Sequence, residues 1–441
     1  MWYEYLFVVL RIVNYVVLGL FALLLLVQLI EIIVALVCKK KTFPKSDKKA
    51  KIAYIIPARN ESSVIYNTVK SVLNNQKYPK ELFNVYVVAN NCTDNTAQEA
   101  SRAGAIVLVH DDPDPKHRMA LYPLKYGIDY ILENDKDTEI IIRLDADNHI
   151  NDEFTSLMND AYQSGSEFSR PYEGAINGAQ NFFTKACSFF YCFDSRFGSR
   201  AREVMKLSAH PNGPGAAMSR KLLLESNGYD VTSICEDTEY TFNRMLEGKT
   251  IRFVEDAVVY EDLPSTGHDT AIRNKRIAAG NKVLLKEKMG KMLKMFFKTF
   301  KFTYLETYTT YIWVSIGGIF FTWFLLIFAY FFIFGGLAAN NVIPLSMFNT
   351  QYFSSAIFTA LIAIAITVAA FYLLFGMLVP TVMTATEYKK YGAKKKSQFV
   401  GLVFFFIIYV LFYAFSLMFG GMKKNVKWEQ VKRNSDYYDK K

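Results

Sequence analysis

The sequence has few cysteines, and three long stretches contain no charged side chain. Its 441 residues include five cysteines, which are scattered, odd in number and never spaced as C-x-x-C. A disulfide framework or a zinc site is therefore not expected. Residues 311–339, 353–383 and 399–419 carry no charge at all. Because transport pathways in membranes usually need ionisable groups, these stretches also argue against a transporter.

The apolar residues are concentrated in segments that are long enough to cross a membrane, which takes about 20 helical residues. The first, residues 5–37, lacks a basic leading region and a small-x-small cleavage site. Residues 1–38 are therefore predicted to be a retained transmembrane anchor rather than a cleaved signal peptide. The three charge-free stretches predict a C-terminal transmembrane region over residues 304–421. We expect a multi-pass protein of the cell membrane.

Lysines cluster directly after the predicted anchor, from Lys39 to Lys51, and again from Lys389 to Lys396. By the positive-inside rule, both clusters are expected in the cytoplasm, together with the soluble domain between them. The net charge of +10 is thus attributed to a membrane partner, and no nucleic acid is expected. The basic tail, residues 422–441, should also be cytoplasmic, but three crossings after a cytoplasmic domain would place it outside. The number of crossings therefore stays open.

Residues 283–303 mix lysines with large apolar side chains. This pattern predicts an amphipathic helix that lies on an anionic membrane surface. The alternative is an ordinary solvated helix that packs on the soluble domain.

Four apolar runs predict neighbouring strands, and each run is followed by polar residues. They cover residues 51–56, 85–89, 105–109 and 140–142, with a helix predicted over 63–75. Strands that alternate with helices are typical of a mainly parallel nucleotide-binding sheet, which binds ligands at the carboxyl ends of its strands. Asp145 and Asp147 follow the last run. Their hard carboxylate oxygens, placed beside a diphosphate, suit Mg²⁺ or Mn²⁺.

Five short motifs occur in the order found in one enzyme family. They are Pro57-Ala58-Arg59-Asn60-Glu61, Asn91-Cys92-Thr93-Asp94-Asn95-Thr96, Asp145-Ala146-Asp147, Gly213-Pro214-Gly215 and Glu236-Asp237. Over residues 48–282 the chain resembles the family 2 glycosyltransferases of the GT-A fold. More closely, it resembles their membrane-embedded branch, with cellulose, hyaluronan and poly-N-acetylglucosamine synthases. The resemblance implies an α/β domain with a mixed, mainly parallel sheet that binds nucleotide sugars and is flanked by transmembrane helices.

The resemblance also implies roles at the reacting centre. Asp237 is expected to be the catalytic base, with Glu236 assisting or orienting it. A compatible alternative is that these two acids cap and begin a helix that continues from Thr238. Asp145 and Asp147 are expected to hold Mg²⁺ or Mn²⁺, and Asp145 also to reach the ribose.

Further residues are expected to line the donor and acceptor sides of the site. The donor pocket is assigned to Pro57, Ala58, Asn60, Glu61, Asn90, Asp94, Lys116, Asp145 and Arg276. Asn90 stands where many family members have an acid that contacts uracil, which weakens the expectation of uridine selectivity. Asp94 could instead cap the following helix, and Lys116 could belong to a solvated basic turn. The acceptor side is assigned to Gly213, Pro214, Gly215 and Ile277, whereas His210 is expected to be structural.

The largest departure from the family lies at residues 273–277, where processive synthases carry Q-x-x-R-W. This chain keeps Arg276 but has Arg273 in place of glutamine and Ile277 in place of tryptophan. An arginine can still clamp a diphosphate. The missing tryptophan removes an aromatic surface on which a growing sugar chain would stack.

These features predict a membrane-bound inverting glycosyltransferase that uses a nucleotide-diphospho-sugar, with a UDP-sugar expected as the donor. The acceptor is expected to be a hydroxyl of a lipid or glycan in cell-surface glycan synthesis. One alternative is a processive polysaccharide synthase. Another is a catalytically inactive nucleotide-binding partner of a synthase, but the retention of Asp145, Asp147 and Asp237 argues against it.

Overall fold

The computed structural model describes residues 2–114, 117, 119–312 and 372–404, and a few isolated residues. These residues form two compact units. One comprises Met1–Glu31 and Met292–Met377, and the other comprises Ile32–Lys291 and Leu378–Lys441. All five motifs lie in the second unit. Lys116 and the tail 422–441 lie outside the described residues.

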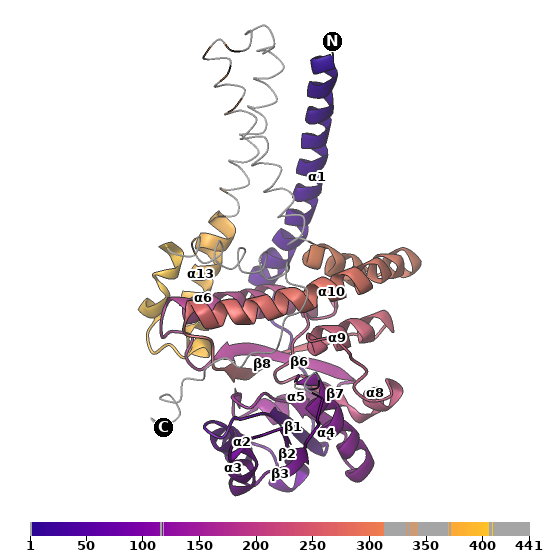
Figure 1. Cartoon of the computed structure of the whole chain (residues 1–441), viewed down its shortest axis with the longest axis vertical. Helices are drawn as coiled ribbons and strands as arrows, with labels where there is room; N and C mark the ends of the chain where they lie inside the picture. Colours follow the sequence, from indigo (N-terminus) through magenta and orange to yellow (C-terminus); the bar gives the residue numbers. More distant parts are fainter. Residues whose placement is uncertain are drawn as a thin grey trace. The chain divides into compact units, whose positions relative to one another are not determined.

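Helices and strands alternate through the first part of the second unit, and a longer mixed region follows (Figure 1). The strands are β1 (Ile52–Ala58), β2 (Phe83–Asn90), β3 (Ile106–His110), β4 (Ile140–Arg143), β5 (His149–Ile150), β6 (Phe168–Ala175), β7 (Ala217–Ser219) and β8 (Arg252–Glu261). The α-helices are α1 (Trp2–Val37), α2 (Ile65–Asn75), α3 (Thr96–Ala103), α4 (Leu121–Asn134), α5 (Phe154–Gln163), α6 (Phe182–Cys192), α7 (Arg200–Val204), α8 (Arg220–Glu225), α9 (Glu236–Leu246), α10 (Gly267–Thr299) and α13 (Val379–Val382). Short 3₁₀ or π-helical turns are η1 (Lys80–Leu82), η3 (Phe193–Ser199), η5 (Tyr372–Leu378), η6 (Met383–Glu387), η7 (Tyr388–Tyr391) and η8 (Lys396–Phe399).

The strands pair in the order β3-β2-β1-β4-β7-β6-β8-β5 and form one sheet. Strands β1 to β4, which we call the parallel half, run in the same direction. Strands β5 to β8, the mixed half, include antiparallel pairs, and β7 joins the halves through its antiparallel pairing with β4. The predicted α/β domain with a mixed sheet is confirmed.

The four strands of the parallel half correspond to the four predicted apolar runs. Ile52, Tyr54 and Ile56 belong to a core that also contains residues of α2, α3 and α5. Alternate residues point to the opposite face, where Gly127 of α4 lets that helix lie against Ile55 and Val88. Because helices cover both faces, the strands are buried on both sides and read as continuous apolar runs.

A mixed sheet was expected, but the individual strands of the mixed half were not predicted from the sequence. Strand β6 contains Arg170, Pro171 and Gly174, residues that normally argue against a central strand. Its pairing with β8 is interrupted by a register shift between Pro171 and Tyr172. Proline is tolerated there because the ladder is already irregular at that point.

The segment that follows the predicted charge-free stretch 353–383 packs against β6. Tyr391 is fully buried, and its hydroxyl oxygen lies 3.2 Å from both the hydroxyl of Tyr172 and the carbonyl oxygen of Glu173. Gly174 faces the carbonyl of Lys390 so closely that an added side-chain carbon would lie 2.5 Å away. Lys390 and Tyr391, far from β6 in sequence, therefore pack against the mixed half.

Helix α10 is continuous from Gly267 to Thr299. The predicted boundary between a domain ending at 282 and a separate amphipathic helix at 283–303 therefore falls inside one helix. In the part of the chain that the structure describes, no helix is both long and apolar enough for a membrane crossing. The predicted anchor, residues 1–38, corresponds to α1 and is not confirmed as a crossing. The charge-free stretches 311–339, 353–383 and 399–419 lie mostly outside the described residues, so these crossings stay predictions.

Candidate functional site

Two carboxylates follow strand β4 at the carboxyl edge of the sheet, as the sequence predicts. Asp147 is buried, whereas the side chain of Asp145 is 36% exposed. Asn148 fixes the turn between them, because its side-chain oxygen accepts a hydrogen bond from the backbone N–H of Asp145 at 2.8 Å. The Asn148 amide also lies 3.4 Å from Asp147 Oδ1. The turn therefore presents one half-exposed carboxylate and one buried carboxylate.

Arg143, the last residue of β4, joins this turn to the start of helix α9. Its guanidinium lies 3.3 Å from Asp145 Oδ1 and 2.8 Å from Glu236 Oε1. Burial of Arg143 favours its neutral form, but the charges of Glu236 and Asp145 outweigh this effect and raise its pKa well above the ordinary value. Arg143 therefore stays charged and holds acids from two distant parts of the chain together.

Helix α9 begins with the acidic pair. Burial raises the pKa of Glu236, although the neighbouring charge of Arg143 opposes this shift. Asp237 Oδ1 accepts a hydrogen bond from the backbone N–H of Thr238 at 2.6 Å. The helix starts at Glu236 and its N-cap is Cys235, so Glu236 belongs to the first turn and is not the cap. Both acids lie in its first turn.

The predicted acceptor loop, residues 210–215, lies directly against this acidic pair. A side-chain carbon added at Gly213 would lie 2.9 Å from Arg143 Nη1 and 3.2 Å from Asp237 Oδ2. Gly215 has a φ of +73°, and an added carbon there would lie 2.6 Å from Pro171. The side-chain amide of Asn212 donates to the carbonyl of Pro214 at 2.9 Å. Both glycines are therefore required, one by close approach and the other by backbone conformation as well.

The carboxylates after β4 fit a divalent cation that is shared with a diphosphate. Within the described ranges, no group of three or more His, Cys, Asp or Glu residues could hold a metal by itself. Mg²⁺ and Mn²⁺ sites often use one or two carboxylates and complete their coordination with substrate phosphates and water. Asp145 and Asp147 provide this partial set of hard oxygen donors.

The motif loops after β1 and β2 are tied together by their own side chains. Asn60 Oδ1 accepts a hydrogen bond from the backbone N–H of Thr93 at 2.8 Å. The backbone N–H of Glu61 donates to Thr96 Oγ1 at 2.9 Å. Asn60 has a φ of +55°, a conformation that asparagine tolerates better than most residues. The two predicted donor motifs therefore form one linked surface at the carboxyl ends of β1 and β2.

Asp94 holds these loops together, but it is not the N-cap of α3, a position that Asn95 occupies. It accepts hydrogen bonds from the backbone N–H groups of Thr96 at 3.0 Å and of Ser62 at 3.2 Å. Burial favours the neutral acid, but these bonds and the hydroxyl of Thr96 lower the pKa of Asp94 below its ordinary value. The bond to Thr96 is an Asx turn.

The remaining predicted donor residues occupy different environments. Pro57 and Ala58, expected in a loop, are the last two residues of β1. Asn90 is only 2% exposed, and its side-chain oxygen lies 3.0 Å from the amide of Asn91 and 2.9 Å from His110 Nδ1. This oxygen is therefore already engaged inside the protein. Lys116 is not among the described residues.

Helix α10 brings the predicted positions Arg276 and Ile277 close to the start of α9. The carbonyl of Ile277 lies 3.9 Å from Cys235 Sγ, one residue before the acidic pair. A side-chain carbon added at Gly280 would lie 2.2 Å from the same sulfur. The charge of Arg276 acts on Cys235, although burial still raises the pKa of that thiol. The backbone of Ile277 is therefore close to the residue that precedes the acidic pair, and its assignment to the acceptor side stays a prediction.

Arg273, which was considered as a possible clamp for a diphosphate, is engaged by other side chains of the protein. Its guanidinium contacts the hydroxyl of Tyr191 and lies 3.5 Å from Glu261 Oε2. Tyr191 also donates a 2.7 Å hydrogen bond to Glu261. Burial raises the pKa of Glu261. The charge of Arg273 lowers this pKa, whereas the charges of Asp147 and Asp145 raise it further. The carboxyl of Glu261 is therefore within electrostatic reach of the turn after β4.

Sequence reasoning assigned no role to Arg143, Glu261 or the fully buried Arg170. One signal was available, because Arg143 ends an apolar strand and a buried arginine almost always has an acidic partner. The identity of that partner, Glu236, follows only from the folded chain.

Comparisons with known proteins agree with this geometry. A model described as Glycosyl transferase family group 2 matches residues 140–379, and one described as Glycosyl transferase family 2 matches residues 54–168. The chain is 25% identical over 406 residues to the probable glycosyltransferase YdaM of Bacillus subtilis strain 168, and the match covers 88% of each protein.

Solved structures also resemble the chain. The mannosyltransferase PcManGT from Pyrobaculum calidifontis, in complex with GDP-Man and Mn²⁺, matches 89% of this chain and 98% of its own, with a TM-score of 0.50 and 15% identity. At this identity the likeness concerns the fold alone. S. aureus TarS 1–349 in complex with UDP-GlcNAc matches 52% of this chain and 66% of its own, with 18% identity and a TM-score of 0.34, too low to support an argument.

Proposed function

The chain belongs to glycosyl transferase family group 2, and we propose that it transfers a sugar with inversion from a nucleotide-diphospho-sugar to a hydroxyl of a lipid or glycan. The observation that carries this proposal is the pairing of Arg143 with both Asp145 and Glu236. This pairing brings the acids after β4 next to Asp237 and the loop 210–215. One small volume thus contains acids suited to a donor diphosphate and an acid suited to accept a proton.

Asp237 is the group that we assign to deprotonate the acceptor. The acceptor hydroxyl attacks the anomeric carbon, the bond to the diphosphate oxygen breaks, and the proton passes to an Asp237 carboxylate oxygen. The leaving diphosphate takes the electron pair of the broken bond. Direct attack from the face opposite the leaving group inverts the anomeric configuration. Glu236 is engaged by Arg143 and therefore orients the start of α9 rather than exchanging protons.

The donor side of the proposed site consists of Asp145, Asp147 and the linked loops after β1 and β2. A divalent metal bound at Asp145 and Asp147 would neutralise the charge that develops on the leaving diphosphate. Mn²⁺ accompanies the donor in the PcManGT complex, which supports Mn²⁺ or Mg²⁺ as the cofactor.

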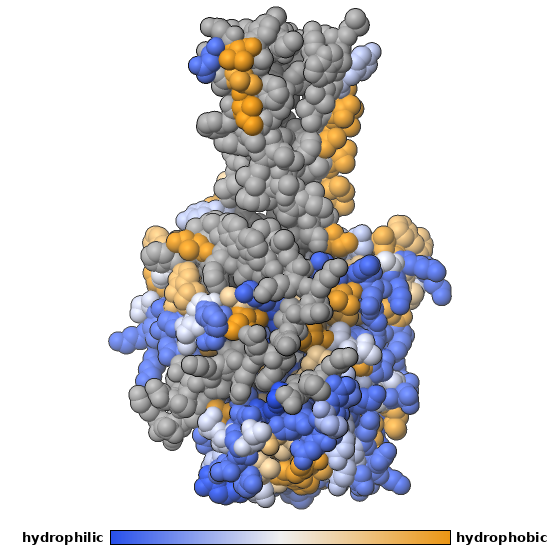
Figure 2. All heavy atoms as spheres, viewed as in Figure 1, coloured by the Kyte–Doolittle hydropathy of each residue, from blue (hydrophilic) through white to orange (hydrophobic). Residues whose placement is uncertain are grey.

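We also propose that the protein acts at a membrane, with this domain in the cytoplasm. Helix α1 carries many exposed large apolar residues, among them Val9, Ile12, Leu20 and Leu23, each at least half exposed. Figure 2 shows apolar side chains along this helix. Exposed apolar surface of this extent is unfavourable in water and favours a lipid environment. The lysines from Lys39 to Lys51 support cytoplasmic placement of the domain.

The proposal is tested by a donor screen with the full chain in detergent micelles. UDP-glucose, UDP-N-acetylglucosamine and GDP-mannose are each added with Mn²⁺, with Mg²⁺ or with EDTA. A donor that binds the native state raises the apparent melting temperature. Nucleotide released by hydrolysis of the same donor reports turnover with water as the acceptor.

We expect one nucleotide sugar to raise the melting temperature and to be hydrolysed, in both cases only with a metal. The absence of both effects for every donor would contradict the assigned activity. Unchanged effects in EDTA would contradict the metal while leaving the transferase assignment intact.

A further inference from the structure

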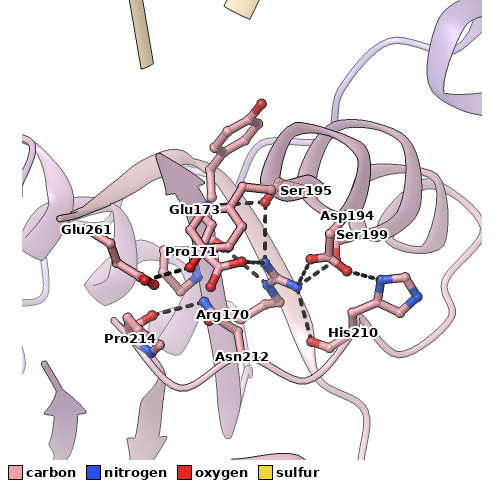
Figure 3. Close-up of polar contacts among 12 residues, drawn as sticks. Arg170, Pro171, Glu173, Asp194, Ser195, Ser199, His210, Asn212, Pro214 and Glu261 are labelled. Atoms are coloured by element: carbon pink, nitrogen blue, oxygen red, sulfur yellow. Dashed lines mark hydrogen bonds and ion pairs between the residues drawn. The ribbon is translucent and has the colours of Figure 1, made fainter. Parts of the chain in front are cut away.

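Arg170 of strand β6 is fully buried and is the centre of a polar network in the mixed half (Figure 3). One nitrogen of its guanidinium, Nη1, lies 2.7 Å from Asp194 Oδ2 and 3.0 Å from Ser199 Oγ. The same nitrogen lies 3.4 Å from the carbonyl oxygen of His210. A buried arginine is stable only with such partners, because its charge is otherwise very unfavourable in the interior.

The partners come from an uncommon element. Residues Phe193–Ser199 form the π-helical turn η3 between α6 and α7. This turn carries Asp194, Ser195 and Ser199, all of which lie within hydrogen-bond or ion-pair range of Arg170. Figure 3 shows the three side chains converging on the guanidinium. π-Helical turns are rare and occur often at functional sites.

Asp194 has a second partner, His210, at the start of the acceptor loop. Its Oδ1 contacts His210 Nδ1, while its Oδ2 contacts Arg170. Burial favours the neutral form of Asp194, but the charges of Arg170 and His210 lower its pKa well below the ordinary value. An ionised carboxylate only accepts hydrogen bonds, so His210 donates from Nδ1. The orientation of the imidazole is therefore fixed by Asp194.

The same π-helical turn also provides the surface on which the imidazole rests. A side-chain carbon added at Gly198 would lie 2.7 Å from His210 Cε1 and 3.0 Å from Nδ1. The ring is thus held between a carboxylate and a glycine of one element. Any side chain at position 198 would therefore force the imidazole of His210 to shift.

The loop that begins at His210 is attached at its far end to β4. The backbone N–H of Gly215 donates to the carbonyl of Arg143 at 2.7 Å. Between these two attachments lies Gly213, where an added side-chain carbon would come within 3.2 Å of both Arg143 and Asp237. His210 and Gly215 therefore set the position of the segment that faces the proposed base, one from each end.

We propose that Asp194, Arg170 and His210 are positioning residues that hold loop 210–215 against Asp237. They do not touch the reacting atoms, but they determine the position of loop 210–215 beside the proposed base, Asp237. This inference rests on the proposed function. It adds that residues of the mixed half position the loop beside the proposed base. A purely structural role would lower stability without changing the turnover of folded protein, whereas a positioning role changes turnover.

The test compares His210→Ala with His210→Asn in the full chain. Asparagine keeps a side-chain N–H close to the position of Nδ1, so it can still donate to Asp194, and alanine cannot. Turnover is measured as nucleotide release with Mn²⁺ from UDP-N-acetylglucosamine and from GDP-mannose. Amide hydrogen exchange over residues 210–216 and over β1 reports the order of the loop independently of any substrate.

For His210→Ala we expect kcat to fall by roughly 10- to 100-fold, as misplacement by about 1 Å can cause. The KM for the donor should stay within about twofold of its original value, because the loops after β1 and β2 are unaffected. Amide exchange should accelerate over residues 210–216 and stay unchanged over β1. His210→Asn should recover most of the lost turnover.

Asp135→Asn is the control, because it removes a buried charge from a different ion pair of the domain. Asp135 is buried and lies 2.8 Å from the Nζ of Lys51, the residue that precedes β1. It should leave kcat and the exchange of residues 210–216 unchanged. If His210→Ala does not fold, Gly198→Ala displaces the imidazole without removing any polar group, and it should accelerate the same exchange.

Unchanged exchange over residues 210–216 in the folded variant would overturn the proposal, and so would an unchanged kcat. If the original protein releases no nucleotide, the proposed function fails, but the exchange experiment still decides whether Asp194 and His210 order the loop.

Discussion

The parallel half of the sheet, β1 to β4, and the mixed half, β5 to β8, are stabilised by different forces. Residues 52–56 and 140–142 are fully or almost fully buried apolar side chains between layers of helix. The mixed half instead buries Arg170, and it brings Glu173 of β6 and Glu261 of β8 within electrostatic range of each other. Burial raises the pKa of Glu173, and the charge of Glu261 raises it further.

This difference has a consequence for function. Apolar burial is non-directional, so the parallel half tolerates small changes in side-chain shape. Buried ion pairs require defined geometry, and the removal of one partner leaves an uncompensated charge. The parallel half therefore provides a stable support for the motif loops after β1 and β2. In the proposed site, the mixed half instead controls the position of individual segments such as loop 210–215.

The largest effect is expected from Asp147→Ala, which removes a carboxylate at the end of the parallel half. Loss of an electrostatic contact to the leaving group should reduce turnover by about 10³-fold or more. Metal-dependent donor binding, measured by calorimetry with Mn²⁺, should be lost together with turnover. If this variant binds the donor and turns over normally, Asp147 is not a metal ligand.

Asp237→Asn affects the other side of the site and should separate binding from chemistry. Asparagine keeps the shape of the side chain but cannot accept the acceptor proton, so kcat should fall by roughly 10²- to 10⁴-fold. Donor binding should survive, in contrast to Asp147→Ala. A variant that loses donor binding while its kcat at saturation is unchanged would show that Asp237 is a binding residue.

Gly213→Ala tests the contact between the acceptor loop and the acids. The added carbon would lie 2.9 Å from Arg143 Nη1, so the loop or the arginine must shift. We expect kcat to fall by about 10- to 100-fold. Gly290→Ala is the matched control, because no atom lies within 4 Å of an added carbon there. Equal activity of the two variants would show that the close approach at Gly213 has no role in turnover.

Asp94→Ala tests the linkage between the donor loops through stability. Asp94 is partly exposed to solvent, which screens its charge, so we expect a loss of about 1 kcal/mol at neutral pH. Since hydrogen bonding lowers the pKa of Asp94 from 3.8, its contribution is present above that pH. The contribution is lost as the pH falls through the lower value of the folded state.

Urea unfolding of both proteins from pH 7 to pH 3 measures this difference. The gap in unfolding free energy should be constant above about pH 5 and should shrink on further acidification. A gap that widens at low pH would contradict the direction of the shift.

The smallest effect is expected from Ile277→Trp, which adds an aromatic surface beside the start of α9. We infer from Ile277 that the enzyme adds one or a few sugars, since a polymerising enzyme needs a surface that retains its product. Sizing of radiolabelled products from membranes should show short products for the original chain and longer ones for the variant. A high-molecular-weight ladder from the original chain would favour a processive synthase.

Much of the donor side could be predicted from the sequence because its signals are local. A run such as Ile140-Ile141-Ile142 has to be buried, and the polar residues after it then lie at the ligand edge. The Asx turn at Asp94 is likewise contained within three residues. The order of the five motifs placed Asp237 and Gly213 in the same site.

The mixed half could not be predicted in the same way. Strand β6 contains a proline, a glycine and a charged residue that become compatible with a strand only beside β8, η3 and residues 387–391. Arg170 gives no local indication that its partner is Asp194, 24 residues away. Helix α10 likewise contains both a predicted donor position and a predicted amphipathic segment without interruption.

The sequence by itself determined the apolar strands of the parallel half, the acids that follow β4 and the acids that begin α9. These features depend on hydrophobic runs and on residue types at short spacing, which a linear chain displays directly. Only the tertiary structure decided that Arg143 joins the two acidic pairs and that Asp194 orients His210 beside the acceptor loop. A buried charge is stabilised by whichever partners the fold brings within a few ångströms, and those partners have no fixed distance along the chain.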